Sequence, residues 1–351
     1  MRWFADHGHD VALAAPPAGA LAKRAGEAGL PLYPIEFHGQ FDPRAILRAR
    51  RAVAAQGAQI VDCRHGSRDG AAFAFARPLC PVVRSRHIAQ PLKGKLRRRL
   101  MWRRGCDHVI ATAECVKRGL VDGGLVASDR VTVVGEWAAD AFFDTARRPE
   151  HRAAVRREFS IPDERPVVSV IGMVRDDKAQ DVVIETVDEM RRRGRPVSAL
   201  IVGSAPIGQE TYERSLHDLT RKLGLIDQIV FTGYRDDVPR LAQASDALVV
   251  TSRIEAQSRT VPQAFASAVP VVASNVGGVG ELVTPGETGW LVEAGDVMGY
   301  ADALGAIFDA PEEARRVTEQ ARRYAEGHLT QAAKMAQTLA LYERLAGNRN
   351  T

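Results

Sequence analysis

The sequence predicts an α/β protein built from two doubly wound domains of parallel sheet. Short apolar segments typical of buried strands alternate along the chain with amphipathic segments typical of helices. Parallel strands need such crossovers, so the alternation favours parallel sheets. The length of 351 residues leaves room for two domains, and the charged, Pro-containing segment 146–165 is typical of a hinge.

Four segments follow from this pattern. We expect a first domain over residues 1–145, a hinge over 146–165 and a second domain over 166–328. Residues 329–351 contain a last amphipathic helix, which is placed to cross back to the first domain.

The first half alternates strand and helix from near its start. Apolar, β-branched runs predict extended segments, and the amphipathic runs between them predict helices. The expected extended segments are residues 11–15, 31–37, 58–63, 81–85, 108–112 and 130–134, and the expected helices are residues 19–28, 43–55, 69–76, 96–104 and 113–121.

The same alternation continues after a short helix that we expect at 151–159, within the hinge. Its strands read as nearly continuous apolar runs, which is typical of strands that are buried on both faces. The expected strands are residues 167–172, 197–203, 229–232, 247–251, 270–274 and 288–292, and the expected helices are residues 180–193, 209–223, 239–244, 260–268, 296–308, 312–327 and 331–345.

Residues 247–292 form the most informative stretch. After the first strand and a polar loop, Thr260 is a suitable N-cap, and Thr260 with Gln263 fits a capping box. Further on, Gly277 and Gly278 are expected to open a second short helix that carries Glu281. Two helix N-termini would then point into one crevice at the carboxyl ends of the strands and favour an anion there.

Glu255 lies in the loop before the first of these helices. An acid that faces an anion site has no obvious structural task, and a carboxylate there is suited to accept hydrogen bonds from sugar hydroxyls. The alternative is an ordinary solvated loop acid.

This stretch resembles the donor-site signature of the retaining family 4 glycosyltransferases, which have the GT-B fold. The signature is an acid, seven residues and a second acid, then a helix of small residues, a Pro-Val-Val-Ala-Ser strand, a Gly-Gly turn with a Glu, and a Thr-Gly strand. The matching residues are Glu255, the helix 263–268, Pro270 to Ser274, Gly277, Gly278, Glu281, Thr288 and Gly289. The resemblance implies two Rossmann-like doubly wound domains that face a cleft.

The resemblance places a nucleotide-sugar donor in the second domain. It implies that Glu255 holds donor-sugar hydroxyls, helped by backbone N–H groups around Ser258, Arg259 and Thr260. Gln263 stands where a second acid is usual and would hold the ribose through neutral bonds, which are about half as strong as charge-assisted ones. The alternative for Gln263 is that it only closes the capping box.

A second part of the donor site follows strand 167–172. The family carries an Arg and a Lys here that clamp the leaving diphosphate, and Lys178 matches the Lys. The Arg position is Met173, and Arg175 is two residues away on the same loop, where it can substitute. Side-chain cations of this kind stabilise the charge that builds on the diphosphate. The alternative for Lys178 is a solvated lysine before a helix.

The turn after strand 229–232 resembles the family's base-binding loop. Gly233 permits close approach of the nucleobase, and Tyr234 or Arg235 would flank it. Gly203, at the end of the preceding strand, is expected to belong to the same donor site. The alternative for Tyr234 is simple packing at a strand end.

In the first domain the resemblance concerns the loops after two neighbouring strands. His87 matches a His that reaches the donor sugar from the acceptor side, and the alternative is a loop His with structural partners. His65, Arg68 and Asp69 follow the preceding strand and are expected to bind the acceptor. The turn Gly8 to Val11 matches one that the family places after a first βα unit, so the resemblance implies that this unit is missing here.

Composition excludes several other classes of protein. Hydrophobic residues make up 45% and charged residues 26%, no apolar run approaches 18 residues, and acids interrupt the N-terminal segment, unlike a signal peptide. The four cysteines lack metal-site spacing, so we expect reduced thiols and a cytoplasmic protein. There is no Asp-x-Asp motif for a metal-bound diphosphate, and we expect neither a metal nor another cofactor.

Basic charge is concentrated in the first half. Residues 1–150 carry a net charge of +9 and the remainder −4, and the excess peaks at 93–104, where Leu96 and Leu100 can share a helix face with Trp102 near its edge. This segment is either a solvated helix face or a peripheral contact with the anionic inner face of the cytoplasmic membrane. Nucleic acid is a third option, but no binding motif supports it.

These observations together predict a retaining glycosyltransferase. It would move a sugar from a nucleotide-sugar donor to a glycan or lipid-linked acceptor, in the synthesis of bacterial lipopolysaccharide or surface polysaccharide. One alternative is a GT-B relic that binds a nucleotide sugar without transferring it, which Met173 and Gln263 favour. Another is a sugar-nucleotide epimerase, which would interconvert donors without any acceptor.

Overall fold

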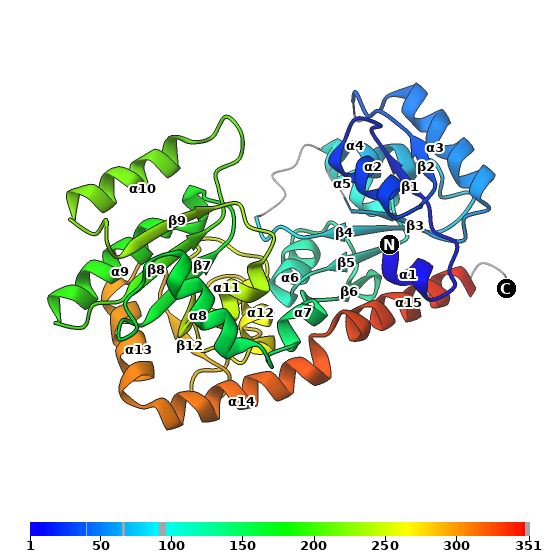
Figure 1. Cartoon of the computed structure of the whole chain (residues 1–351). Helices are drawn as coiled ribbons and strands as arrows, with labels where there is room; N and C mark the ends of the chain where they lie inside the picture. Colours follow the sequence, from blue (N-terminus) through cyan, green and yellow to red (C-terminus); the bar gives the residue numbers. More distant parts are fainter. Residues whose placement is uncertain (40, 65–66, 91–95, 348–351) are drawn as a thin grey trace. The chain divides into compact units, whose positions relative to one another are not determined.

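The computed structural model describes residues 1–39, 41–64, 67–90 and 96–347. The chain divides into two compact units, which we describe separately (Figure 1). Unit 1 comprises Met1–Gly135 and Ala332–Thr351, and unit 2 comprises Glu136–Gln331. The chain therefore passes between the units twice.

The predicted hinge at 146–165 is wrong, because this segment is an integral part of unit 2. Its helix α8 (Arg148–Glu158) places Val155, which is fully buried, in a cluster with Leu200 and Leu241. Arg152 of α8 pairs with Asp246 at 2.5 Å. The charges that suggest a solvated hinge are thus engaged in contacts with distant parts of the chain. The two segments of unit 2 that lead to unit 1 lie next to each other, because the Ala138 N–H donates to the Leu329 carbonyl at 3.0 Å.

Unit 1 contains two separate parallel sheets. The larger has the order β3-β4-β5-β6, and β1 and β2 form a smaller sheet of their own. The strands are β1 (Leu13–Ala15), β2 (Leu32–Pro34), β3 (Val61–Cys63), β4 (Val82–Arg86), β5 (His108–Ala111) and β6 (Val131–Val133), and the helices are α1 (Arg2–Asp6), α2 (Ala20–Glu27), α3 (Pro43–Gln56), α4 (Ser67–Ala74), α5 (Leu96–Arg104) and α6 (Glu114–Asp122).

The last helix, α15 (Gln331–Gly347), packs on the larger sheet of unit 1. Leu341 is buried with Val83 and Ile110. The Tyr342 hydroxyl donates to Asp62 at 2.6 Å, and burial raises the pKa of Tyr342, which keeps this hydroxyl a donor. One polar contact and an apolar stripe therefore fix the helix to β3 and its neighbours.

Unit 2 is a six-stranded parallel sheet with the order β12-β11-β10-β7-β8-β9. The chain runs outward from β7 in one direction and from β10 in the other, so the switch point lies between these two strands. The strands are β7 (Val167–Ile171), β8 (Ser198–Val202), β9 (Ile229–Gly233), β10 (Ala247–Val250), β11 (Val271–Ser274) and β12 (Trp290–Val292), and the helices besides α8 are α7 (Asp140–Phe143), α9 (Gln180–Arg192), α10 (Thr211–Lys222), α11 (Val238–Ala244), α12 (Thr260–Ala266), α13 (Val297–Asp309) and α14 (Pro311–His328).

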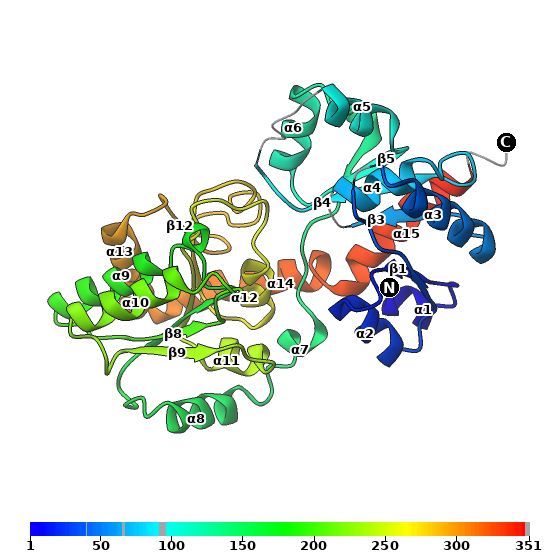
Figure 2. The ribbon, with the colours of Figure 1, turned by 90° about the horizontal axis from the view of Figure 1, so that it is seen from above.

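Alternate residues of these strands are buried on opposite faces of the sheet. Figure 2 shows α8 and α11 on one side and α9 and α10 on the other. Val168 packs toward the α9 and α13 side, whereas Val167 packs toward α8 and α11. This double burial explains why the strands read as continuous apolar runs rather than as an alternating pattern.

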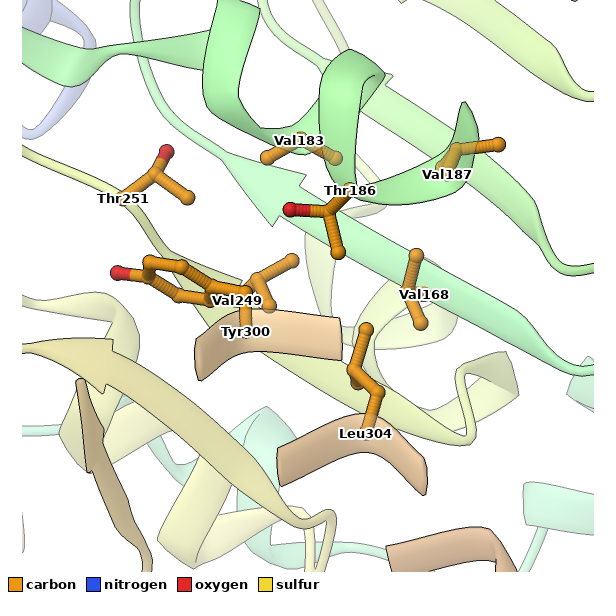
Figure 3. A pocket seen from close by; sticks show the side chains of 8 residues that line it. All are labelled: Val168, Val183, Thr186, Val187, Val249, Thr251, Tyr300 and Leu304. Carbon is orange, nitrogen blue, oxygen red and sulfur yellow. The ribbon is translucent and has the colours of Figure 1, made fainter. Parts of the chain in front are cut away.

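A small, mostly apolar cavity lies on the α9 side of β7 and β10 (Figure 3). Val183 of α9 and Leu304 of α13 line it, together with Tyr300, which is fully buried. The Tyr300 hydroxyl donates to the Val250 carbonyl at 2.7 Å. This bond anchors α13 to the last residue of β10, directly before the loop that carries Glu255.

We expect Tyr342→Phe to weaken the attachment of α15. The change removes one hydrogen bond to a carboxylate, which contributes about 1.5–3 kcal/mol, and leaves the ring packing in place. The measurement is the urea midpoint, together with hydrogen exchange of the α15 amides. Tyr324→Phe, at an exposed ring of α14, is the matched control. Equal exchange in the two variants would contradict the role assigned to Tyr342.

Candidate functional site

The candidate site lies at the switch point of unit 2. The loop after β7 contains a single turn of 3-10 helix, η2 (Asp176–Lys178), and the loop after β10 runs from Thr251 to Arg259. The two strands lie side by side in the sheet, so both loops begin at the same edge. Because the chain departs in opposite directions here, a crevice is expected between these loops.

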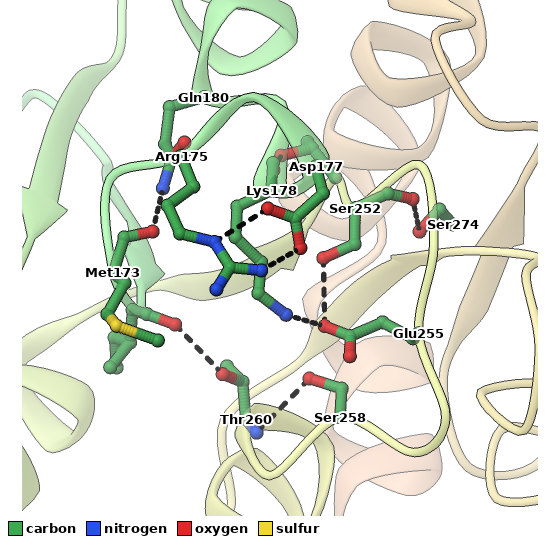
Figure 4. Close-up of polar contacts among 12 residues, drawn as sticks. Met173, Arg175, Asp177, Lys178, Gln180, Ser252, Glu255, Ser258, Thr260 and Ser274 are labelled. Atoms are coloured by element: carbon green, nitrogen blue, oxygen red, sulfur yellow. Dashed lines mark hydrogen bonds and ion pairs between the residues drawn. The ribbon is translucent and has the colours of Figure 1, made fainter. Parts of the chain in front are cut away.

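Lys178 and Glu255 meet at the centre of this site (Figure 4). The Lys178 ammonium forms a close ion pair with Glu255 Oε1, and the Ser252 hydroxyl donates to the same oxygen at 2.9 Å. The two side chains are only 24% and 12% exposed. Neither is therefore the ordinary solvated residue that the sequence left open as an alternative.

The glycine turn after β11 supports the main chain at Glu255. The Gly278 N–H donates to the Ala256 carbonyl at 2.8 Å, and Gly277 has a left-handed φ of +54°. A Cβ on Gly277 would lie 1.8 Å from the Glu255 carbonyl oxygen. The glycine is therefore required for the two loops to approach so closely.

Arg175 lies on the same loop as Lys178, but its guanidinium is paired with Asp177. Arg175 Nε is 2.8 Å from Asp177 Oδ1, and Nη2 is 2.5 Å from Oδ2. This bidentate pair lowers the pKa of Asp177. Met173, which replaces the expected Arg, is 52% exposed, and its carbonyl accepts from Gln180 Nε2 at 3.0 Å.

The predicted capping box at α12 is wrong. The helix begins at Thr260 itself, and its N-cap Arg259 makes no side-chain cap bond. The Thr260 hydroxyl instead donates to the Ile171 carbonyl at 3.1 Å, and the Ser258 hydroxyl accepts from the Thr260 N–H at 3.3 Å. A tertiary contact with the end of β7 therefore takes the hydroxyl that the local pattern assigned to capping.

Gln263 is consequently not engaged in capping. Its side chain is half-buried and makes no hydrogen bond to any residue that the structure describes. The alternative that Gln263 only closes the capping box is excluded, and its amide can bind a ligand. Arg322 and Arg148 satisfy carbonyls at the other end of α12, at Ala266 and Ala268.

The second predicted helix N-terminus, at Gly278, does not form. Residues 277–282 make successive turns, and the exposed Glu281 lies in one of them. The three glycines of this segment are poor helix formers, and Pro285 follows closely. The expected pair of helix N-termini is therefore reduced to α12 alone.

The turn after β9 combines residues of two kinds. Gly233 is left-handed, with open space at its Cβ position, and Tyr234 is 69% exposed. Arg235 is instead held by Asp237 at 2.8 Å and by Glu158 at 2.7 Å. Tyr234 thus has the exposure that a base-stacking residue needs, whereas Arg235 is used in an ion-pair cluster.

Gly203, predicted to bind the donor, has a clear structural reason to be glycine. Its φ is +139°, and a Cβ would lie 1.9 Å from the Gly172 carbonyl oxygen. The Gly203 N–H also donates to the Gly233 carbonyl at 3.0 Å. Close approach of neighbouring strand ends therefore accounts for this glycine.

The predicted acceptor residues lie in unit 1. His87 is exposed and directly follows β4. Arg68 donates to the Phe37 carbonyl at 3.3 Å, and Asp69 accepts from the Gly70 N–H at 2.7 Å. His65 lies outside the described residues.

Sequence reasoning missed Arg84, which is buried inside unit 1. Its guanidinium carbon lies 4.1 Å from the centre of the Trp102 ring, and a Cβ on Gly70 would lie 2.7 Å from it. Trp102 is only 5% exposed, whereas Leu100 is 49% exposed. The predicted apolar face of α5 is therefore wrong, because Trp102 rather than Leu100 faces the interior.

The start of the basic segment, residues 93–95, lies outside the described residues.

The described residues lack two kinds of feature. No group of three or more His, Cys, Asp or Glu side chains in this part of the chain is arranged to hold a metal ion. No helix within it is long and apolar enough to cross a membrane.

Two Rossmann-like units with parallel sheets, with a lysine–glutamate pair at the switch point of the second, define a protein of the GT-B class. The chain belongs to the family 4 glycosyltransferases. Residues 151–324 match the family model described as glycosyl transferases group 1, and residues 1–136 match the model described as glycosyltransferase family 4.

Two relatives of the chain are themselves named as glycosyltransferases. The chain is 31% identical over 245 residues to a D-inositol 3-phosphate glycosyltransferase of Nocardia farcinica, covering 68% of this chain and 53% of the relative. It is 30% identical over 163 residues to the lipopolysaccharide core biosynthesis mannosyltransferase LpsB of Rhizobium meliloti, covering 46% of each. The chain thus spans about half the length of the curated relatives it matches.

Solved structures of similar fold cover nearly the whole chain. A glycosyltransferase of Rickettsia africae has a TM-score of 0.87 at 19% identity, covering 98% of this chain and 92% of its own. Anabaena HepE in complex with UDP and glucose has a TM-score of 0.81 at 21% identity, covering 97% and 94%. At such identities the likeness establishes the GT-B fold.

We expect Gly277→Ala to displace the loop that carries Glu255. The new methyl group meets the Glu255 carbonyl oxygen, and alanine also resists the left-handed conformation, so stability falls by about 2 kcal/mol or more. Gly286→Ala is the matched control, because Gly286 has φ +74° and open space, so only the conformational cost of about 1 kcal/mol applies. Thermal unfolding of both variants tests this, and equal losses of stability would refute the contact.

Proposed function

We propose that the chain transfers a sugar, with retention of its anomeric configuration, from a nucleotide-sugar donor to a glycan or lipid-linked acceptor. The observation that carries this proposal is the Lys178–Glu255 pair at the switch point of unit 2. A cation suited to a diphosphate and a carboxylate suited to sugar hydroxyls lie side by side there, as the adjoining phosphate and sugar of a nucleotide sugar would require. HepE, which shares the fold, is described with UDP and glucose.

Donor binding would exchange the partners of this pair. Sugar hydroxyls donate to Glu255, and the ammonium of Lys178 turns to the diphosphate, where negative charge grows as the sugar leaves. Arg175 joins Lys178 by exchanging Asp177 for a phosphate oxygen.

The nucleoside part of the donor has its own contacts. Gln263 binds the ribose, and the exposed ring of Tyr234 stacks on the base above Gly233. Backbone N–H groups near Ser258 and Arg259 complete the site, with Glu281 at its edge.

The transfer step that we propose retains the configuration at the anomeric carbon. The bond between the anomeric carbon and the phosphate oxygen breaks, and the acceptor oxygen bonds to the same face of that carbon. The acceptor proton passes to the leaving diphosphate oxygen. Because Lys178 and Arg175 carry the charge, we expect the step to proceed without a metal ion.

We assign acceptor binding to the loops of unit 1 that follow β3 and β4. His87, Arg68 and Asp69 of unit 1 are our candidates for acceptor binding, and His87 is the residue expected to reach the donor sugar. The named relative LpsB favours a role in bacterial lipopolysaccharide or surface polysaccharide synthesis. We propose peripheral contact with the inner face of the cytoplasmic membrane through the arginines of α5.

A second candidate is a protein that binds a nucleotide sugar without transferring it. The uncharged Met173 and the pairing of Arg175 with Asp177 favour it, since both reduce the positive charge available to a leaving diphosphate. The two candidates differ in turnover. A transferase slowly releases nucleoside diphosphate from its donor even into water, whereas a pure binding protein does not.

We expect one of UDP-glucose, GDP-mannose and ADP-glucose to bind. Glu255→Ala and Gln263→Ala should each weaken the binding of that nucleotide sugar. Each change removes hydrogen bonds to the donor, so affinity falls about tenfold or more for Glu255 and less for the neutral Gln263. Ligand-observed NMR is the measurement, and release of nucleoside diphosphate is followed on the donor that binds. Glu319→Ala, an exposed acid of α14, is the control. If no nucleotide sugar binds the wild type, the proposal fails.

Asp177→Asn should tighten nucleoside diphosphate binding by about three- to tenfold, because it releases Arg175 from its bidentate partner. Isothermal titration with the nucleotide that binds is the measurement. Adding Arg175→Met should abolish the gain, and the exposed Asp163→Asn controls for the general loss of a negative charge. An unchanged or weaker affinity in Asp177→Asn would show that Arg175 does not bind the diphosphate.

A further inference from the structure

The turn η2, which ends in Lys178, presents three consecutive carbonyls to the loop after β10. The Lys178 carbonyl accepts from the Thr251 hydroxyl at 2.9 Å. The Asp177 carbonyl accepts from the Arg253 N–H at 2.9 Å, and the Asp176 carbonyl accepts from Arg253 Nη1. Two of the three bonds come from Arg253, a residue that the donor site described above does not use.

We propose that Arg253 is a positioning residue, which holds the turn of Lys178 against the loop of Glu255. The proposal rests on the proposed function, since it concerns the geometry of the same site. Arg253 lies two residues before Glu255 in the chain. It therefore connects the backbone that carries the carboxylate directly to the backbone that carries the ammonium.

The far end of the Arg253 side chain is fixed as well. Its Nη2 donates to Asp181 Oδ2 at 2.6 Å, while the other carboxylate oxygen accepts from the Tyr212 hydroxyl at 2.6 Å. The same hydroxyl accepts from the Asp181 N–H at 3.2 Å. Arg253 is thus held between the main chain of the turn and the first turn of α9. A lysine cannot make both contacts at once, because they need two nitrogens of one planar fork.

Arg253 also balances charge beside the expected diphosphate. Asp176 lies 3.5 Å from Arg253 Nη1, and Asp181 is its bonded partner. Without the guanidinium, two carboxylates would stand uncompensated near a site that has to bind an anion. Geometry and charge therefore both favour arginine at this position.

The first experiment measures hydrogen exchange of the ligand-free chain, so it does not depend on any donor. In Arg253→Met we expect the amides of Lys178 and Ala179, which close the turn, to exchange at least about tenfold faster, while the amides of β7 and β10 stay unchanged. Arg253→Lys should restore part of the protection. Arg193→Met, which removes an arginine paired with Glu189 and Asp302 in the same unit, is the control. Unchanged exchange at Lys178 and Ala179 would overturn the proposal.

The second experiment is a double-mutant cycle with Lys178→Met, read as the affinity for UDP, GDP and ADP. If Arg253 acts through Lys178, Arg253→Met weakens binding of one nucleotide about tenfold, and adds little once Lys178 is replaced. Effects that multiply would show that Arg253 acts independently, which overturns the proposal. If the wild type binds none of the three nucleotides, the proposed function fails, and the exchange measurement still decides whether Arg253 positions the turn.

Discussion

The contact between Lys178 and Glu255 is the constraint on which the rest of the site depends. A mostly buried ion pair is costly to desolvate, and it persists only where geometry and further hydrogen bonds are good. Here the Ser252 hydroxyl adds a bond to the same carboxylate oxygen, and the reversal of strand order at β7 and β10 places both loops at one edge of the sheet. Fold and site are thus linked, because a different strand order would separate the two residues.

Much of unit 2 could be predicted from the sequence, because its signals are local. Strands buried on both faces read as apolar runs, and the Gly-Gly turn that the sequence pattern groups with Glu255 does contact the loop that carries it. Two of the failures share one cause, which is competition from distant residues. Thr260 has the local features of an N-cap, yet it bonds to Ile171. The charges of α8 suggest solvent, yet Arg152 pairs with Asp246. No local pattern reveals such partners.

In the candidate site, each of three cations has a carboxylate partner. Lys178 pairs with Glu255, Arg175 with Asp177, and Arg253 with Asp181. On the proposed function, binding of a diphosphate would exchange ion pairs instead of filling an unpaired positive site, and the net gain in free energy would be smaller than the charges alone suggest. The first two pairs would have to open for a donor, whereas the third also holds backbone carbonyls and supports the arrangement. This difference separates the residues expected to touch the ligand from the one that positions them.

Three glycines at the same edge of the sheet also differ in whether the fold or a ligand would require them. Gly203 and Gly277 face backbone oxygens, at 1.9 Å and 1.8 Å from where a Cβ would lie, so the fold itself requires them. Gly233 has open space at that position, and its left-handed φ of +66° only explains why a glycine is preferred there. A ligand can approach the chain closely only where no other part of the protein already does. On the proposed function, Gly233, next to the exposed ring of Tyr234, is therefore the glycine of the three whose missing side chain would leave room for a nucleobase.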